Sequence, residues 1–259
     1  MLRNSFILLN GVGAQRERSL WRSGVLTWED FEAEDRVKGI SEESKSRMNR
    51  ELEIAASRLD ARDSAYFART VSRREHWRCL GEFGRSVAFV DIETTGLSLR
   101  SPITVLGIFD GSRMHTLVRG RDLNTQNIKA LLGSVELIVT YNGASFDIPI
   151  LESQFEGAIP QVPHVDLRHP LRRLGLAGGL KRIERELGLE RDRRVEYMTG
   201  EDAVYLWRLW EREGKRNALD LLIEYNEADC RNLKALAKHA YGLLRRRTFE
   251  SASSSGNVE

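Results

Sequence analysis

Acidic side chains occur at three places where a core strand or helix would ordinarily be apolar. The first is Asp91-Ile92-Glu93, which ends the apolar run at residues 87–92. Alternate residues of a strand point to the same face, so Asp91 and Glu93 would share one face of a buried strand. Two buried carboxylates repel each other and lose solvation unless a cation lies between them. This pair therefore favours a metal site over a capping role.

The second place is Asp147, which follows another apolar run at residues 136–141. Taken alone, this segment has a simpler explanation, because Asp is a favoured residue at a helix N-terminus. The preceding pair Asn142-Gly143 is typical of a turn. We expect a helix over residues 147–155, and by itself this segment favours capping over metal binding.

The third place is the pair Tyr225 and Asp229 in a long helix predicted over residues 218–246. Residues four apart share one face of a helix. Leucines on or near that face turn it inward; they are Leu222, Leu233 and Leu236. A buried aspartate needs a partner, and two remain open: a metal ion, or arginine side chains at the rim of the helix.

Together the three places would bring four carboxylates to the ends of sheet strands, namely Asp91, Glu93, Asp147 and Asp229. Hard oxygen ligands in that number suit Mg²⁺ or Mn²⁺ rather than zinc. Two such ions about 4 Å apart stabilise the attacking and leaving oxygens when a phosphodiester is displaced. Tyr225 beside them could orient the attacking water or help to deprotonate it.

The order of these motifs resembles that of the DEDD (DnaQ-like) 3′–5′ exonuclease superfamily, which has the ribonuclease H-like fold. Residues 91–96 (DIETTG) are similar to its first motif and residues 142–147 (NGASFD) to its second. Tyr225 and Asp229 are similar to the third motif of its tyrosine-containing DEDDy subgroup. Residues 66–69, 74–78 and 179–188 look like the YprB-like branch of ribonuclease H-like exonucleases. The resemblance covers roughly residues 60–246.

This resemblance implies a nuclease that holds two Mg²⁺ or Mn²⁺ ions on the four carboxylates. We expect it to release nucleotides from a single-stranded 3′ end of DNA or RNA. Thr94, Asn142 and Phe146 are expected to contact the nucleic acid or support the site. Two alternatives stay open: a catalytically idle nuclease fold that binds nucleic acid or acts as a scaffold, and an oligonucleotidase or RNA-processing exonuclease. The cost of burying carboxylates favours an active enzyme.

The elements that must position these residues are those of an α/β fold, with a mixed sheet flanked by helices and a small N-terminal helical module. Apolar runs predict strands at residues 87–92, 103–109, 114–118 and 136–141. Helical patterns after Asp166 predict helices at residues 167–174, 180–187, 201–212 and 218–246. We expect Asp166 to cap a strand end or lie behind the site. His164 and His169 are expected to be structural or to contact phosphate.

Basic residues gather near these helices, although the net charge of the chain is only +2. Residues 168–194 carry nine basic and four acidic side chains, a local charge of +5. Such a surface attracts a phosphate backbone, and Lys181 and Arg182 belong to it. A solvated helix face is the alternative.

The N-terminal residues 1–35 are predicted to form a helix-hairpin-helix-like module. Its turn would be Gly11-Val12-Gly13, whose glycines let backbone N–H groups approach a phosphate. Arg16 would add positive charge there, and a protein-interaction module is the alternative. Residues 36–84 are predicted to be a helical connector, with an exposed helix at 41–60 outside the core. The exonuclease domain would span residues 85–247, followed by a disordered tail at 248–259.

Composition excludes several other classes of protein. Hydrophobic residues make up 41% and charged residues 30% of the chain, which rules out collagen-like, disordered and membrane classes. No apolar run approaches the roughly 18 residues that span a bilayer, and the first residues lack the features of a signal peptide. Two cysteines, Cys79 and Cys230, indicate neither a disulfide framework nor a cysteine metal cluster. We therefore expect a cytoplasmic setting.

Overall fold

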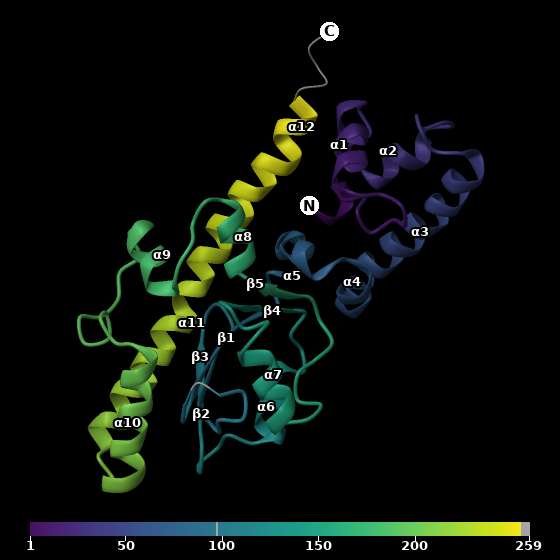
Figure 1. Cartoon of the computed structure of the whole chain (residues 1–259). Coiled ribbons are helices and arrows are strands. Elements are labelled where there is room, and N and C mark those ends of the chain that lie inside the picture. Colours follow the sequence, from purple (N-terminus) through teal and green to yellow (C-terminus); the bar gives the residue numbers. More distant parts are fainter. Residues whose placement is uncertain (97, 255–259) are drawn as a thin grey trace.

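A five-stranded mixed sheet lies at the centre of the protein, which confirms the predicted α/β class (Figure 1). The computed structural model describes residues 1–96 and 98–254. The strand order is β3-β2-β1-β4-β5, in which β1 pairs antiparallel with β2 and parallel with β4. The strands are β1 (Val87–Thr94), β2 (Ile103–Phe109), β3 (Met114–Val118), β4 (Leu137–Thr140) and β5 (His164–Asp166).

Alternation along β1 divides its side chains between two layers. Ala88, Val90 and Ile92 pack with residues of α6 (Thr125–Leu132) and α7 (Asp147–Gln154) on one face. Val87 and Phe89 belong to the core on the other face, beneath the 30-residue helix α11 (Arg216–Arg245). Asp91 and Glu93 continue this second row because the side-chain period of a strand is two. The strand therefore presents both carboxylates to α11.

The close approach of α11 to the sheet depends on Gly107 in β2, which is the strand neighbour of Asp91. A Cβ atom at this position would lie 2.2 Å from Asn226 Oδ1 and 2.7 Å from Cys230 Sγ, both on α11. Any side chain at residue 107 would therefore push the helix away. A glycine inside a strand often marks such an approach. Here it sets the spacing between the two elements that carry acidic residues.

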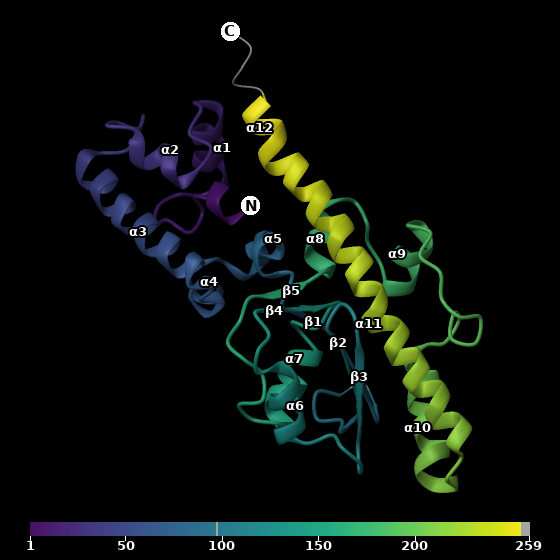
Figure 2. The same cartoon turned by 180° about the vertical axis from the view of Figure 1, so that it is seen from behind.

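The helices that follow β5 lie close to their predicted positions. They are α8 (Arg168–Arg173), α9 (Leu180–Glu186), α10 (Gly200–Glu213) and α11. Seen from behind, α11 runs the length of the molecule, from α10 at one end to α1 and α12 at the other (Figure 2). None of the helices within the described residues is long and apolar enough to cross a membrane.

The chain stays helical beyond α11, through the π-helical turn η3 (Arg246–Glu250) and α12 (Ser251–Ser254). The predicted disordered tail is therefore wrong for residues 248–254. The reason is packing against the N-terminal helices: Phe249 meets Trp21 edge-on, with ring centroids 5.3 Å apart, and Ala252 is buried. The remaining tail residues, 255–259, lie outside the described residues.

Seven helical elements precede the sheet: η1 (Leu2–Asn4), α1 (Ala14–Arg22), α2 (Trp28–Ala33), α3 (Glu42–Asp60), α4 (Ser64–Thr70), η2 (Arg73–Cys79) and α5 (Leu80–Phe83). The expected helix-hairpin-helix geometry is not seen, because no α-helix precedes the glycines within the described residues 1–13. Gly11 does adopt a positive φ of 83°, and Arg16 donates to its carbonyl at 3.0 Å. The turn is present, but the helix before it is a single 3-10 turn.

Helix α3 corrects a second expectation, because it contributes to the core. Met48, Leu52, Ala55 and Leu59 are all buried and join the same apolar cluster as residues of α1, α2 and α11. These sparse apolar positions recur at intervals of four and three residues and so form one continuous stripe. Because residues 41–60 are mostly polar, their composition did not indicate this narrow buried face.

A buried ion pair joins α1 to η2. The Arg78 guanidinium donates to both carboxylate oxygens of Glu17, at 2.9 and 2.8 Å, and the two side chains are only 2% and 1% exposed. Arg78 also donates to Glu75 at 2.9 Å, and Glu17 accepts from the Phe6 backbone N–H at 2.8 Å. Each charge is thus fully partnered, which a buried pair requires.

We expect Glu17→Gln to lower the free energy of unfolding by about 3 kcal/mol, because Arg78 would lose the charge that compensates its burial. Chemical denaturation measures this difference. The control is Glu29→Gln, since Glu29 makes an exposed pair with Arg3, and it should change the free energy by no more than about 0.5 kcal/mol. Equal unfolding midpoints for the two variants would contradict a structural role for the buried pair.

Candidate active site

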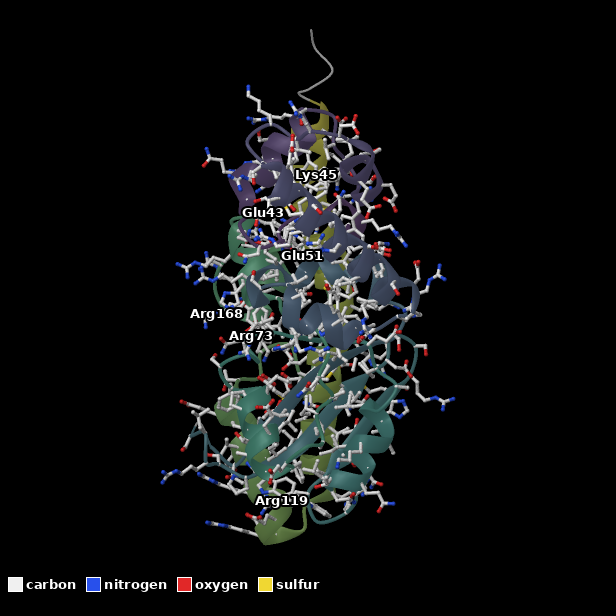
Figure 3. All side chains as sticks on the ribbon, turned by 90° about the vertical axis from the view of Figure 1, so that its right-hand side faces the viewer. Glu43, Lys45, Glu51, Arg73, Arg119 and Arg168 are labelled. Carbon is white, nitrogen blue, oxygen red and sulfur yellow. The ribbon has the colours of Figure 1, made fainter. Side chains whose placement is uncertain are left out.

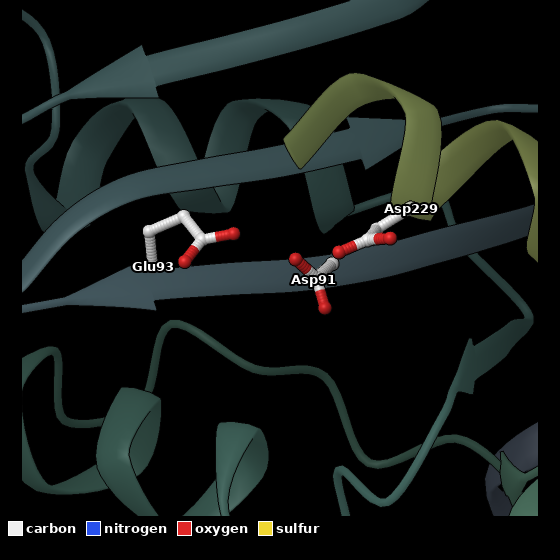
Figure 4. Close-up of side chains that lie close together, drawn as sticks. All are labelled: Asp91, Glu93 and Asp229. Atoms are coloured by element: carbon white, nitrogen blue, oxygen red, sulfur yellow. The ribbon is translucent and has the colours of Figure 1, made fainter. Parts of the chain in front are cut away.

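Three of the four predicted carboxylates lie together where α11 passes over β1. One oxygen from each of Asp91, Glu93 and Asp229 lies within 4.8 Å of the other two. Figure 4 shows Asp229 projecting from the helix toward Asp91, with Glu93 farther along the same strand. Glu93 and Asp229 are buried and Asp91 is half-buried. Strand periodicity and the packing of α11 together create this cluster.

Asp147 lines the same pocket, although it stands outside the group of three. Its Oδ1 accepts from the backbone N–H of Ile92, between the two acidic residues of β1, at 3.2 Å. Asp147 is the first residue of α7, and Phe146 occupies the N-cap position without a side-chain cap. Asp147 therefore joins α7 to β1 instead of capping its helix. The pocket has a volume of about 200 Å³, and Thr94, Asn142, Phe146 and Tyr225 also line it.

Burial raises the pKa values of all four carboxyl groups, and repulsion within the group adds to this rise for Asp91, Glu93 and Asp147. Burial is the main cause for Asp91 and Glu93, and repulsion from Asp229 is next for both. Burial raises the pKa of Asp147 to about 7. Such a cluster disfavours its own ionised form and gains stability when a cation is bound. A donor set made only of carboxylate oxygens fits a hard divalent metal ion.

Arg191, which sequence analysis counted in a basic surface, is buried beside the carboxylates instead. Its side chain is 3% exposed and forms an ion pair with Asp229. Arg191 also donates to both oxygens of Glu184 at 2.6 Å, and Asn232 donates to Glu184 at 3.0 Å. The arginine partner that we left open for Asp229 is thus present. It does not exclude a metal, because a carboxylate has two oxygens.

Tyr225 and Lys181 stack beside the carboxylates. Tyr225 is 7% exposed, and the Lys181 Nζ lies 4.3 Å from the centre of its ring. Burial raises the pKa of the Tyr225 hydroxyl, and the neighbouring Asp229 raises it further. The hydroxyl therefore stays protonated near neutral pH. A protonated hydroxyl can donate a hydrogen bond to a water molecule, as the first of the two roles that we considered for Tyr225 requires.

The turn after β4 is held by Asp166, at the end of β5. Its carboxylate accepts from the backbone N–H groups of Asn142 at 2.7 Å, Ala144 at 3.1 Å and Arg168 at 3.0 Å. Asn142 has a positive φ of 64° and also accepts from the Arg168 side chain. Asp166 thus caps the strand end, as one of our two expectations stated, and fixes the turn that lines the pocket.

The other predicted residues occupy varied environments. The Thr94 hydroxyl donates to the Gly96 carbonyl, and Arg182 is exposed on α9. His164 has a structural environment: its Nε2 lies 2.8 Å from Thr140 Oγ1, and burial lowers its pKa to about 4. The hairpin residues Gly11, Gly13 and Arg16 do not line the carboxylate pocket; they lie with the N-terminal helices.

Sequence reasoning missed several residues that shape the site. Asn226 donates to Asp91 Oδ2 at 2.8 Å and to its backbone carbonyl at 3.1 Å, while Gly107 makes room for this contact. Arg191 and Glu184 are buried partners behind Asp229. Gly107 left a signal, since it is the one glycine within a strand of otherwise larger residues. No sequence pattern indicated the ion pair between Arg191 and Glu184, because the sequence does not distinguish a buried arginine from an exposed one.

A protein-family model described as the RNase H superfamily matches residues 88–241. The match begins in β1, ends in α11 and includes all four carboxylates. The chain therefore belongs to the RNase H superfamily, and its mixed sheet with flanking helices fits that fold. Comparisons with curated proteins and with solved structures give no match. Membership in this superfamily suggests a nuclease that acts on nucleic acid.

We expect Asp91→Asn to raise the melting temperature in EDTA, because removing one negative charge relieves repulsion in the cluster. A gain of about 1 kcal/mol corresponds to roughly 2–4 °C. The wild type should be stabilised by added Mn²⁺, by about 2.7 kcal/mol at one hundred times the dissociation constant, and the variant should not. Asp220→Asn, in an exposed pair on α11, is the matched control. Retention of the full Mn²⁺ effect by Asp91→Asn would remove Asp91 from the ligand set.

Proposed function

We propose that the protein is a metal-dependent 3′–5′ exonuclease that hydrolyses phosphodiester bonds of DNA or RNA. The observation that carries this proposal is the cluster of Asp91, Glu93 and Asp229, buried at the junction of β1 and α11. Asp147 and Tyr225 line the same pocket. The order of the motifs resembles the DEDDy subgroup, and superfamily membership supports a nuclease in general.

In this proposal Asp91, Glu93, Asp147 and Asp229 hold two Mg²⁺ or Mn²⁺ ions. When bound, these ions supply Lewis-acid stabilisation to the attacking and leaving oxygens of the phosphodiester. The surrounding residues hold the carboxylate side chains in position. Asn226 donates to Asp91, and the Ile92 N–H donates to Asp147. Arg191 pairs with Asp229, which favours its ionised form.

Tyr225 acts as the residue that positions the attacking water. Its hydroxyl is protonated and stands beside the carboxylates. Asn142 and Phe146 line the pocket opposite α11 and contact the terminal nucleotide. A pocket of about 200 Å³ favours a single unpaired nucleotide over a base pair. This size supports a single-stranded 3′ end as the substrate.

Two further expectations stay proposals. Arg182 is an exposed residue of the basic surface and would contact the phosphate backbone, whereas Lys181 would act from within the site. The turn with Gly11, Gly13 and Arg16 would contact nucleic acid or a protein partner. The alternative of an idle nuclease fold has one observation in its favour, because Arg191 already places a cation against Asp229. Activity measurements separate these two functions.

Incubation with 5′-labelled single-stranded and double-stranded DNA and RNA, with Mn²⁺ or with EDTA, tests the proposal. We expect stepwise shortening of single strands from the 3′ end, dependent on Mn²⁺. Asp91→Asn and Asp229→Asn should each lower the rate by at least about 10²-fold, because each removes a carboxylate needed for metal-ion catalysis. Mn²⁺-dependent binding without any shortening would support the idle scaffold. Near wild-type activity in either variant would refute the assignment of the site.

Tyr225→Phe should lower kcat by about 10- to 100-fold, because the hydroxyl acts on water in the transition state. The Mn²⁺ dissociation constant, measured by calorimetry, should stay within about twofold, since the hydroxyl is not needed as a ligand. The phenylalanine variant keeps the ring beneath Lys181, so it serves as its own packing control. Loss of Mn²⁺ binding together with activity would assign Tyr225 a structural role.

A further inference from the structure

Two grooves lie beside the turn at residues 142–147, which also lines the carboxylate pocket. The first has a volume of about 480 Å³ and shares Tyr141 and Asn142 with that pocket. The second, of about 720 Å³, is lined by Ala144 from the same turn and by His169 from α8. The turn at residues 142–147 thus contributes to all three hollows, and helix α8 lines both grooves. A chain that leaves the carboxylate pocket through the first groove crosses α8 to reach the second.

Positive charge dominates both grooves. Two arginines and no acidic residue line the first groove, and three arginines line the second; they are Arg168, Arg172, Arg69, Arg73 and Arg74. The acidic residues of the second groove are Glu152 and Asp166, and the Asp166 oxygens already accept three backbone N–H groups. The grooves therefore present a positive surface to any ligand.

Four of these arginines have no partner that would hold them. Within the described residues, the side chains of Arg69, Arg73, Arg74 and Arg172 make no hydrogen bond or ion pair to another side chain. Their neighbour Arg173, in contrast, pairs with Glu75 at 2.8 Å. Unpaired guanidinium groups with five donors each are suited to bind phosphate, often through two parallel hydrogen bonds.

The second groove is a fixed feature, because η2 is anchored to the sheet. The His164 backbone N–H donates to His76 Nδ1 at 3.0 Å, so His76 Nε2 carries the proton and donates to the Val71 carbonyl at 3.0 Å. This clamp brings η2, nearly 90 residues earlier in the chain, against β5. In Figure 3 the labelled side chains of Arg73 and Arg168 lie near the same edge of the molecule.

We propose that these two grooves form the path of the substrate strand. Starting from the 3′ end in the carboxylate pocket, the strand crosses Arg168 and Arg172 and continues into the second groove. There its phosphates contact Arg69, Arg73 and Arg74. This inference rests on the proposed function and identifies the ligand as a single-stranded polynucleotide several nucleotides long. The contacts are electrostatic and independent of sequence.

The double variant Arg73→Glu/Arg74→Glu tests the path by binding alone. Fluorescence anisotropy with 5′-labelled oligothymidylates of 3 and 15 nucleotides is measured in EDTA, so that no hydrolysis is needed. We expect the 15-nucleotide strand to bind about 10- to 100-fold more weakly, whereas the trinucleotide is too short to reach the second groove. Losing two phosphate contacts should also flatten the dependence of log K on log salt by about 1.4.

The matched control is Arg208→Glu/Arg212→Glu on α10, because these arginines are exposed and line neither groove. Both double variants change the net charge equally. An equal loss of affinity in the two variants would therefore show that only overall charge matters, and it would overturn the proposed path. Unchanged affinity for the 15-nucleotide strand would also overturn it. A loss of affinity found only in Arg16→Glu/Arg18→Glu would overturn it as well, because the strand would then bind at the N-terminal turn.

Melting temperatures establish that each variant is folded. If Arg73→Glu/Arg74→Glu melts early, Arg73→Gln/Arg74→Gln replaces it, with a smaller loss of affinity expected in the same direction. The outcome is separable from that of the nuclease assay. A protein that binds the long strand through Arg73 and Arg74 yet shortens no strand would support the path and refute the exonuclease.

Discussion

The contact of α11 with β1 is the interaction on which the rest of the structure depends. It must hold Asp91, Glu93 and Asp229 together although burial and mutual repulsion oppose their ionisation. Apolar packing supplies the attraction, through buried α11 residues such as Cys230 and Leu233 against Phe89. Gly107 allows the helix to come close enough for Asn226 to bond to the strand. A cation among the carboxylates would remove the remaining electrostatic cost.

The N-terminal helices support this contact from the far end of α11. They share one apolar core with the end of that helix, and the Glu17–Arg78 pair joins them to η2. In turn η2 is bonded to β5 through His76 and His164. The same clamp places basic residues of η2 beside the turn that lines the carboxylate pocket. The N-terminal region therefore contributes to the neighbourhood of the site as well as to stability.

Arg191 gives the site an internal counter-charge. It lies between Asp229 and Glu184, both of them buried, and forms an ion pair with each. A buried charge that lost its partner would be costly, so these three residues are expected to act as a unit. Burial raises the pKa of Asp229, and the paired Arg191 opposes this rise. It also ties the loop before α10 to α11, and α10 itself lines the pocket through Gly200 and Val204.

What the sequence determined by itself was local. Strand periodicity placed Asp91 and Glu93 on one face, helical spacing paired Tyr225 with Asp229, and the order of the motifs indicated the superfamily. The strands and the helices after β5 followed from runs and periods a few residues long. The tertiary structure alone decided that Arg191 turns inward, that α3 enters the core, and that Arg73 and Arg74 line a groove beside the turn at residues 142–147. These outcomes depend on contacts between residues far apart in the chain, and no local pattern specifies which arginine will meet a buried carboxylate and which will stay in solvent.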